Sequence, residues 1–298
     1  MTPLVDLHLH SNFSDGVHPP AEVVRMAARA GLAAIALCDH DNIDGIDEAQ
    51  AAGAILGIEV LAGVELSALW QGYEDLHLLG YGFDHHHAGL QRALAEFRDF
   101  RERRNEHIVA RVNEKLRSEG RFPIDFAAVR EKAGGTVGRP HIAMALMDAG
   151  HVQGSEEAFV RYLVPCNVAK RFFPLDEAIA LVHQAGGVAV LAHPPFITNE
   201  LKTFETLLDA FVPLGLDGVE AWNSGASNNQ IDQYITAARR RGLIVTGGSD
   251  YHGIEGGEIV IGGGRGNLKI PYACVEEIRA RLAARRSSVS PCSLQGPR

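Results

Sequence analysis

The sequence is poor in cysteine and has no long apolar run. Its four cysteines are widely spaced and none forms a Cys-X-X-Cys pair, which argues against a zinc ribbon or a disulfide framework and favours a reducing compartment. No apolar stretch approaches the roughly 20 residues that a membrane helix requires. The chain begins with a predicted strand rather than a signal peptide. We therefore expect a cytoplasmic protein with no membrane partner.

Positive charge is also scarce. The 28 lysines and arginines face 37 acidic residues, which gives a net charge of −9. Such a balance usually disfavours phosphate and nucleic acid ligands, but divalent cations held by some of the carboxylates would reverse the local field. The arginines between residues 98 and 104 alternate with acidic residues, a pattern typical of a solvated helix face rather than an RNA track. We expect no DNA-binding module.

What the sequence does contain, at its start, is a pattern typical of a metal site. His8, His10 and Asp15 lie within eight residues of one another. On a strand, side chains alternate between faces, so His8 and His10 point the same way. A lone His-X-His pair is about equally compatible with a structural role, so the rest of the chain has to decide.

Further histidines and carboxylates lie in or directly after β-type runs. They are His40, Glu65, His77, His193, Asp250 and His252. Active sites of (β/α) barrels form at the C-terminal ends of the strands, where all nine side chains would gather. Nitrogen and oxygen ligands without thiolate suit manganese, zinc or iron(II). Nine ligands exceed the needs of one ion, so we expect two or three metals that share Glu65 and hold a bridging hydroxide for phosphate ester hydrolysis.

The pattern of runs predicts an α/β fold with an insertion. Seven β-type runs alternate with helical stretches, which indicates parallel strands, crossover helices and a closed or nearly closed barrel. Residues 90–169 break the alternation with helical periodicity and are predicted to form a helical insertion over the barrel mouth. The barrel would comprise residues 1–89 and 170–286, and residues 287–298 a disordered tail. The predicted strands lie near 4–9, 33–39, 59–66, 75–82, 188–192, 217–222 and 243–248.

Several short motifs resemble the successive motifs of the PHP (polymerase and histidinol phosphatase) family. They are His8-Leu9-His10, Asp15-Gly16, Asp39-His40-Asp41, Gly63-Val64-Glu65, Leu191-Ala192-His193-Pro194 and Gly248-Ser249-Asp250-Tyr251-His252. The resemblance implies a distorted (β/α)7 barrel, related to the amidohydrolases, with a trinuclear metal centre at its mouth.

The resemblance also implies how the ligands are shared. One metal would be held by His8, His10, Glu65 and Asp250, a second by Glu65, His77 and His193, and a third by Asp15, His40 and His252. Glu65, His193 and Asp250 are the residues we expect to be catalytic. No ligand position is substituted, which argues against a non-catalytic PHP module that serves a partner protein.

Within the insertion, Arg139-Pro140-His141 resembles a signature of bacterial PHP phosphoesterases that act on 3′,5′-nucleotide bisphosphates or degrade RNA from its 5′ end. A guanidinium and an imidazole near the metals could clamp a second phosphate. The alternative is a simple helix start, with Pro140 in the first turn. Lys170 and Arg171 could add charge to the clamp or form a solvated pair.

We also expect Asn223 and Ser224, which follow a predicted strand, to bind nucleotide or phosphate, with a loop cap as the alternative. The run His85-His86-His87 is left out of the site because no carboxylate stands at ligand spacing. The proton donor to the leaving oxygen stays open between Asp41 and a metal-bound water.

The sequence thus predicts a metal-dependent phosphatase that removes the 3′-phosphate of a nucleoside 3′,5′-bisphosphate such as pAp and leaves the 5′-monophosphate. One alternative is a 5′-to-3′ exoribonuclease on short 5′-phosphorylated RNA. Another is a histidinol phosphatase-like phosphomonoesterase. From a different class, the alternative is the non-catalytic partner-binding module.

Overall fold

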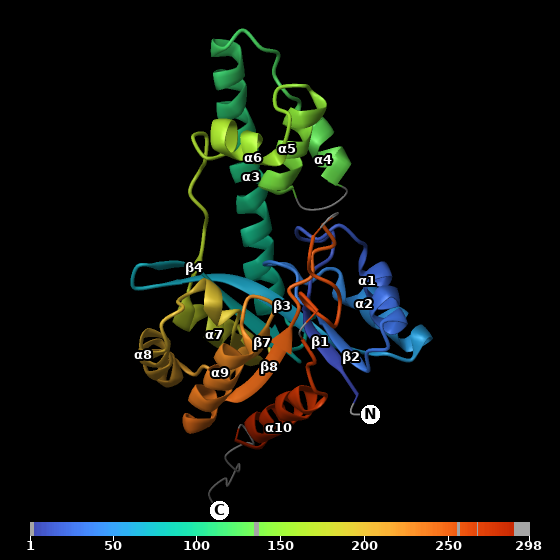
Figure 1. Cartoon of the computed structure of the whole chain (residues 1–298), viewed down its shortest axis with the longest axis vertical. Coiled ribbons are helices and arrows are strands. Elements are labelled where there is room, and N and C mark those ends of the chain that lie inside the picture. The colour runs from blue at the N-terminus through green and yellow to red at the C-terminus, as the bar shows by residue number, and fades with distance from the viewer. Residues whose placement is uncertain (1–2, 134–136, 255–256, 267, 289–298) are drawn as a thin grey trace, which may run out of the picture.

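A nearly closed barrel forms one half of the molecule, and a helical part stands on it (Figure 1). The computed structural model describes residues 3–133, 137–254, 257–266 and 268–288. Seven strands form one continuous path, which confirms the predicted distorted barrel. In path order they are β1 (Val5–Leu9), β2 (Ala34–Leu37), β3 (Glu59–Trp70), β4 (Tyr73–Tyr81), β6 (Val188–Leu191), β7 (Gly218–Asn223) and β8 (Ile244–Gly248).

The barrel closes where β1 meets the end of β8. Asp250 N donates to His8 O over 3.0 Å, and His10 N donates to Tyr251 O over 3.0 Å. A short strand outside the path, β5 (Phe173–Pro174), pairs with β3. These closing bonds bring the two histidines of β1 and the Asp250 loop to the same mouth of the barrel.

One strand departs from the predicted parallel order. β4 is antiparallel to both β3 and β6, so the expectation of parallel strands with crossover helices is wrong here. β3 and β4 form a hairpin in which Trp70 pairs with Tyr73. Gln71 and Gly72 both have positive φ, 42° and 87°, as a two-residue hairpin turn of matching twist requires. The Gln-Gly pair between two alternating runs was the signal for it.

Helices cover the outside of the barrel. The helices that alternate with the strands include α1 (Pro20–Arg29), α2 (Ile46–Leu56), α7 (Leu175–Gln184) and α9 (Asn228–Arg240). Two further helices are α8 (Leu201–Phe211) and α10 (Ala273–Ser288). Because α10 ends at Ser288, it contains the first two residues of the predicted tail; residues 289–298 lie outside the described part.

The helical part follows β4 and precedes β5. It comprises α3 (Ala88–Ser118), α4 (Phe126–Ala133), α5 (Arg139–Asp148), α6 (Ser155–Ala158) and the π-helical turn η1 (Phe159–Leu163). The first turns of α3 pack into the barrel core through Leu90, Leu94 and Phe97. Its later turns pack through Ile108 and Val112 into a separate core with α4, α5 and η1. One straight helix therefore belongs to both cores (Figure 1).

Among the described residues, no helix is both long and apolar enough to cross a membrane.

Candidate active site

The nine predicted ligands meet at one end of the barrel. Three lie on strands, His8 on β1, Glu65 on β3 and His77 on β4, and the others lie in loops that follow β1, β2, β6 and β8. Two of these loop residues have a strained backbone: φ is 24° at His193 and 60° at Asp250. Strain of this kind is held in place where a side chain must be aimed at a site.

Glu65 is the hub of the cluster. Its Oε2 lies 3.2 Å from His8 Nε2, 3.2 Å from His10 Nε2 and 3.1 Å from His40 Nδ1. Its Oε1 lies 2.7 Å from His77 Nδ1 and 2.9 Å from His193 Nε2. Burial would raise the pKa of Glu65, but the imidazoles, His40 foremost, hold the pKa well below its usual range. The carboxylate is therefore ionised at neutral pH and touches five imidazoles.

The other carboxylates flank this hub. Asp250 Oδ1 lies 3.2 Å from His10 Nε2. Asp15 Oδ1 lies 3.3 Å from His252 Nε2, and Asp15 Oδ2 lies 3.7 Å from His40 Nε2. Three sets of ligand atoms are each close enough to hold one ion. These sets are His8, His10, Glu65 and Asp250; His40, Glu65 and His77; and His10, Asp15, His40 and His252.

Unsatisfied polar atoms indicate that the ligand cluster fits a metal centre. Many ligand-type atoms of the cluster are buried without a well-directed hydrogen bond in the described part of the chain. They are His8 Nε2, His10 Nδ1, His10 Nε2, Asp15 Oδ1, His40 Nδ1, Glu65 Oε2 and His193 Nδ1. Buried polar atoms are normally paired, so such a concentration needs a ligand to explain it. A nitrogen and oxygen donor set suits divalent transition metals.

A residue absent from the prediction orients two of the ligands. Glu220 of β7 is fully buried; its Oε1 accepts from His8 Nδ1 over 2.9 Å, and its Oε2 accepts from His193 N over 2.8 Å. A carboxylate on one imidazole nitrogen fixes the tautomer and turns the other nitrogen to the metal. The sequence signal was a glutamate in the middle of the apolar run Gly218–Ala221.

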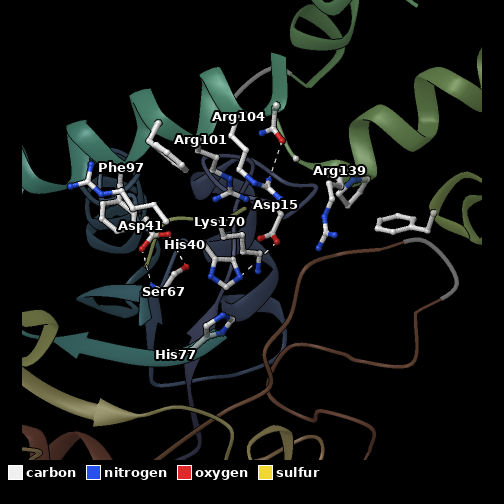
Figure 2. A pocket seen from close by; sticks show the side chains of 16 residues that line it. Asp15, His40, Asp41, Ser67, His77, Phe97, Arg101, Arg104, Arg139 and Lys170 are labelled. Carbon is white, nitrogen blue, oxygen red and sulfur yellow. Dashed lines mark hydrogen bonds and ion pairs between the residues drawn. The ribbon is translucent and has the colours of Figure 1, made fainter. Parts of the chain in front are cut away.

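A cavity of about 250 Å³ opens beside the cluster, between the barrel mouth and α3 (Figure 2). On the barrel side it is lined by Asp15, His40 and His77, and by Asp41, whose carboxylate accepts from Ser67 N and Oγ over 2.9 and 2.8 Å. Burial raises the pKa of Asp41. The side facing the insertion is lined by Arg101, Arg104, Asn105, Arg139, Phe159, Lys170 and Arg171 among others.

Two arginines of this wall have unengaged head groups. Neither Arg101 on α3 nor Arg139 at the start of α5 makes a hydrogen bond or ion pair within the described residues. Arg139 has its guanidinium 5.6 Å from the ring centre of Phe159. Figure 2 shows both side chains directed into the cavity. The arrangement provides an anion site next to the candidate metal centre.

Arg104 shows that the basic stretch of α3 is not simply a solvated face. It is buried, and it donates to Val168 O and Asn167 Oδ1 over 2.8 Å each. Burial, followed by the charges of Arg139 and Arg101, lowers its pKa to about 10. The prediction of a solvated stripe is therefore wrong for Arg101 and Arg104, although Arg98 does pair with Asp44.

The two basic residues that lead back to the barrel line the cavity with acidic partners. Lys170 Nζ lies 2.6 and 2.8 Å from the carboxylate oxygens of Asp75. Arg171 Nη2 lies 3.4 Å from Glu96 Oε2, and its guanidinium stands 4.8 Å from the ring centre of Phe97. Both could bind a phosphate only in competition with these carboxylates.

Three predicted substrate residues are engaged in the fold instead. His141 Nδ1 accepts from Gly138 N over 2.9 Å, so its imidazole caps α5. Asn223 is buried and donates to Glu220 over 3.1 Å, and Ser224 donates to Ser249 O over 2.6 Å. None of the three is among the described residues that line the cavity.

A further histidine group lies on the surface, away from this site. Asp47 Oδ1 of α2 lies 2.8 Å from His85 Nε2 and 3.8 Å from His86 Nε2. The sequence argument that this run lacks a carboxylate partner is therefore wrong, because α2 supplies one from far away in the sequence.

The chain is similar to known proteins over most of its length. The model of the family described as PHP domain matches residues 6–163. A 5′-3′ exoribonuclease of Haemophilus influenzae is 36% identical over 255 residues, which cover 85% of this chain and 91% of that protein. A 3′,5′-nucleoside bisphosphate phosphatase of Chromobacterium violaceum is 35% identical over 260 residues, 86% of this chain and 90% of that protein.

The fold is similar to a solved structure of an amidohydrolase from Chromobacterium violaceum with bound sulfate and no metal. The TM-score is 0.76 at 30% identity, with 94% of this chain and 96% of that chain covered.

Proposed function

Because this chain belongs to the PHP family of metal-dependent phosphoesterases, we propose that it removes the 3′-phosphate of a nucleoside 3′,5′-bisphosphate such as pAp and leaves the 5′-monophosphate. The observation that carries the proposal is the pairing of two features in one cavity. Asp15, His40 and His77 of the ligand cluster face the unengaged guanidinium groups of Arg101 and Arg139. A substrate with two phosphates fits a site with two anion-binding parts.

The chain's own residues have distinct tasks in this reaction. Arg101 and Arg139 hold the 5′-phosphate, with Arg104 as a fixed charge behind them, and so orient the 3′-phosphate at the cluster. The ligands we propose are His8, His10, Asp15, His40, Glu65, His77, His193, Asp250 and His252. Two or three divalent metals bound there would activate water and neutralise the phosphoryl oxygens.

The relative from Chromobacterium violaceum, a 3′,5′-nucleoside bisphosphate phosphatase, supports this substrate. We propose manganese as the metal, although zinc or iron would suit the same donors. We place the enzyme in the cytoplasm, where the buried thiols of Cys38, Cys166 and Cys274 would stay reduced.

A second candidate function is 5′-to-3′ cleavage of short RNA, which the Haemophilus influenzae relative favours. A 5′-phosphorylated oligonucleotide presents the same 5′-phosphate beside a 3′-phosphodiester. In both reactions water attacks phosphorus, the bond from phosphorus to O3′ breaks, and O3′ takes up a proton. One cavity could therefore serve both substrates.

Phosphate and nucleotide release from a panel of substrates tests the proposal. The panel is pAp, 3′-AMP, 5′-AMP, histidinol phosphate and a short 5′-phosphorylated RNA, each with manganese supplied. We expect pAp to be hydrolysed far better than 3′-AMP, because 3′-AMP lacks the phosphate that the arginines hold. Equal rates on both, or hydrolysis of histidinol phosphate alone, would reject it.

The clamp itself is tested by Arg139→Ala. We expect KM for pAp to rise far more than KM for a simple aryl phosphate, which has no second phosphate. Arg103→Ala is the matched control, because Arg103 is an exposed arginine of α3 that donates to Asp99 O. Equal losses on both substrates would reject the clamp.

A further inference from the structure

Phe196 is an exposed aromatic residue at the barrel mouth. Its exposed fraction is 66%, and among the described residues the other phenylalanine exposed to a similar extent is Phe122 in the insertion, at 86%. An exposed phenyl ring costs free energy in water unless something covers it. Phe196 therefore presents an uncovered apolar face within reach of the candidate active site.

The ring lies directly against the ligand cluster. Its centre is 5.0 Å from the ring centre of His193 in an edge-on arrangement, and His193 Nε2 is 2.9 Å from Glu65 Oε1. On its other side, His193 stands 4.9 Å from the ring centre of His77. His77 lines the cavity with the arginines, whereas neither His193 nor Phe196 is among the described lining residues. His77 and His193 therefore connect that cavity with Phe196 through successive ring contacts.

The backbone holds the ring in place. Phe196 ends a short 3₁₀ turn that starts at Pro194, and its N–H donates to His193 O over 3.0 Å. A Cβ on Gly225 would lie 3.6 Å from Cζ of Phe196, so the loop after β7 passes near the tip of the ring. Asn223 fixes this loop, since its Oδ1 accepts from Gly225 N over 2.8 Å. A fixed and exposed ring is suited to stacking.

A dinucleotide offers this ring a base to stack on, and this step rests on the second candidate function proposed above, 5′-to-3′ cleavage of short RNA. If the 5′-phosphate of the first nucleotide lies among Arg101 and Arg139, the first nucleoside fills that cavity and its 3′-phosphodiester lies at the cluster. The second nucleotide, attached to the same phosphorus, has to leave by another side. We infer that Phe196 stacks on the base of this second nucleotide and so favours RNA over a free nucleoside bisphosphate.

Kinetics of matched substrates test the inference. The substrates are pAp, the dinucleotide pApA, and pAp joined to a second ribose without a base, all with the manganese-loaded enzyme. We expect Phe196→Leu to lower kcat/KM for pApA about tenfold, which equals about 1.4 kcal/mol and lies in the range of base stacking on an aromatic side chain. The other two substrates should be unaffected, because they offer no second base.

Two further variants separate stacking from packing. Phe196→Trp should keep the preference for pApA, and Phe122→Leu should change nothing. Equal losses of Phe196→Leu on all three substrates would overturn the inference, since the ring would then only support His193 or touch the first base. An unchanged rate on pApA would overturn it as well.

The inference and the proposed function fail in different ways. If the wild-type enzyme hydrolyses pAp but not pApA, the phosphatase stands and the stacking role is overturned. If it hydrolyses no nucleotide at all, the proposed function fails and the inference falls with it.

Discussion

The two ends of the barrel differ in how their buried carboxylates are paired. At the mouth, Glu65 touches five imidazoles, yet within the described part of the chain its Oε2 and several of their nitrogens have no well-directed hydrogen bond. At the other end, buried Asp217 precedes β7 and is fully satisfied by protein. Its carboxylate accepts from His183 Nε2 over 2.9 Å, Ala189 N over 2.9 Å and Arg285 Nη2 over 2.7 Å.

The difference separates stability from function along one set of strands. Burial would raise the pKa of Asp217, but the bonds from His183, Ala189 and Arg285 outweigh it and lower the pKa. That end of the barrel is complete without a ligand. The mouth keeps unsatisfied donors and acceptors, and this is where barrel enzymes place their chemistry.

The largest effect is expected from the hub of the mouth. Glu65→Gln removes a charge that two of the three candidate ligand sets share. Loss of an outer partner of a metal ligand can lower activity about 100-fold, and we expect hydrolysis of pAp to fall by more than that. Circular dichroism of the variant should match the wild type. A variant that keeps a tenth of the wild-type kcat/KM would contradict this role.

At the opposite end the effect should appear in stability instead. Asp217→Asn leaves Arg285 and His183 facing a neutral amide, so the free energy of unfolding at pH 7 should drop by about 3 kcal/mol. Because the folded state lowers the pKa of Asp217, its contribution is present above the ordinary pKa near 4 and is lost as the pH falls through the folded value. Denaturant unfolding at pH 7 and at acidic pH measures both.

The control for Asp217 is Asp209→Asn, which removes the ion pair of an exposed carboxylate with Arg241 and should change the free energy of unfolding far less. The folded Asp217→Asn enzyme should keep its kcat/KM on pAp. If Asp217→Asn lost as much activity as Glu65→Gln, the proposed separation of stability and function between the two ends of the barrel would be wrong.

A smaller effect is expected from Glu220 of β7, whose carboxylate accepts hydrogen bonds from two of the candidate ligands. Glu220→Gln keeps the shape but weakens the bonds to His8 Nδ1 and His193 N, so metal affinity or activity should fall about 10- to 100-fold. Added manganese should recover part of the rate if affinity is what was lost. No change in manganese dependence would show that the carboxylate does not orient the ligands.

The smallest effect concerns pH. Burial opposes protonation of His77, but the charge of Glu65 and the carboxylate of Asp75, 3.6 Å from His77 Nε2, raise its pKa to about 10. The pKa of His10 is likewise raised to about 10, against burial, by the carboxylates of Asp250 and Glu65, each 3.2 Å from its Nε2. Both imidazoles are therefore protonated in the metal-free protein at pH 7, and metals must displace these protons.

We expect metal binding at pH 7 to release protons, and metal affinity to weaken about tenfold per pH unit for each proton displaced as the pH falls. Calorimetry in two buffers of different ionisation enthalpy counts these protons. Metal binding without proton release would show that the imidazoles are neutral before the metal arrives.

The sequence predicted the ligand cluster at the barrel mouth better than the strands and side chains around it. His8, His10 and Glu65 lie on or after strands, and a strand end fixes where a side chain goes. The β3–β4 hairpin was missed because the alternation of strands and helices predicts parallel neighbours, and the Gln71-Gly72 turn signal between these two runs was overlooked. Arg104 was misjudged from charge alone, although it continues the buried helical stripe of Leu90, Leu94 and Phe97, at spacings of three and four.

Other side chains depended on contacts that no local pattern shows. Ser224 donates to Ser249 O, which lies 25 residues further along the chain. Asp47 reaches His85 across 38 residues of sequence. Such pairings arise only when the packed helices and loops bring distant segments together.

The number of manganese ions bound per chain at saturation tests the central claim most directly. It is best counted by equilibrium dialysis of metal-stripped Asp47→Ala, which lacks the surface group of Asp47, His85 and His86. The unsatisfied atoms at the mouth predict two or three ions per chain, and fewer in the same background with Glu65→Gln. One ion or none, with pAp still hydrolysed after chelation, would contradict the account.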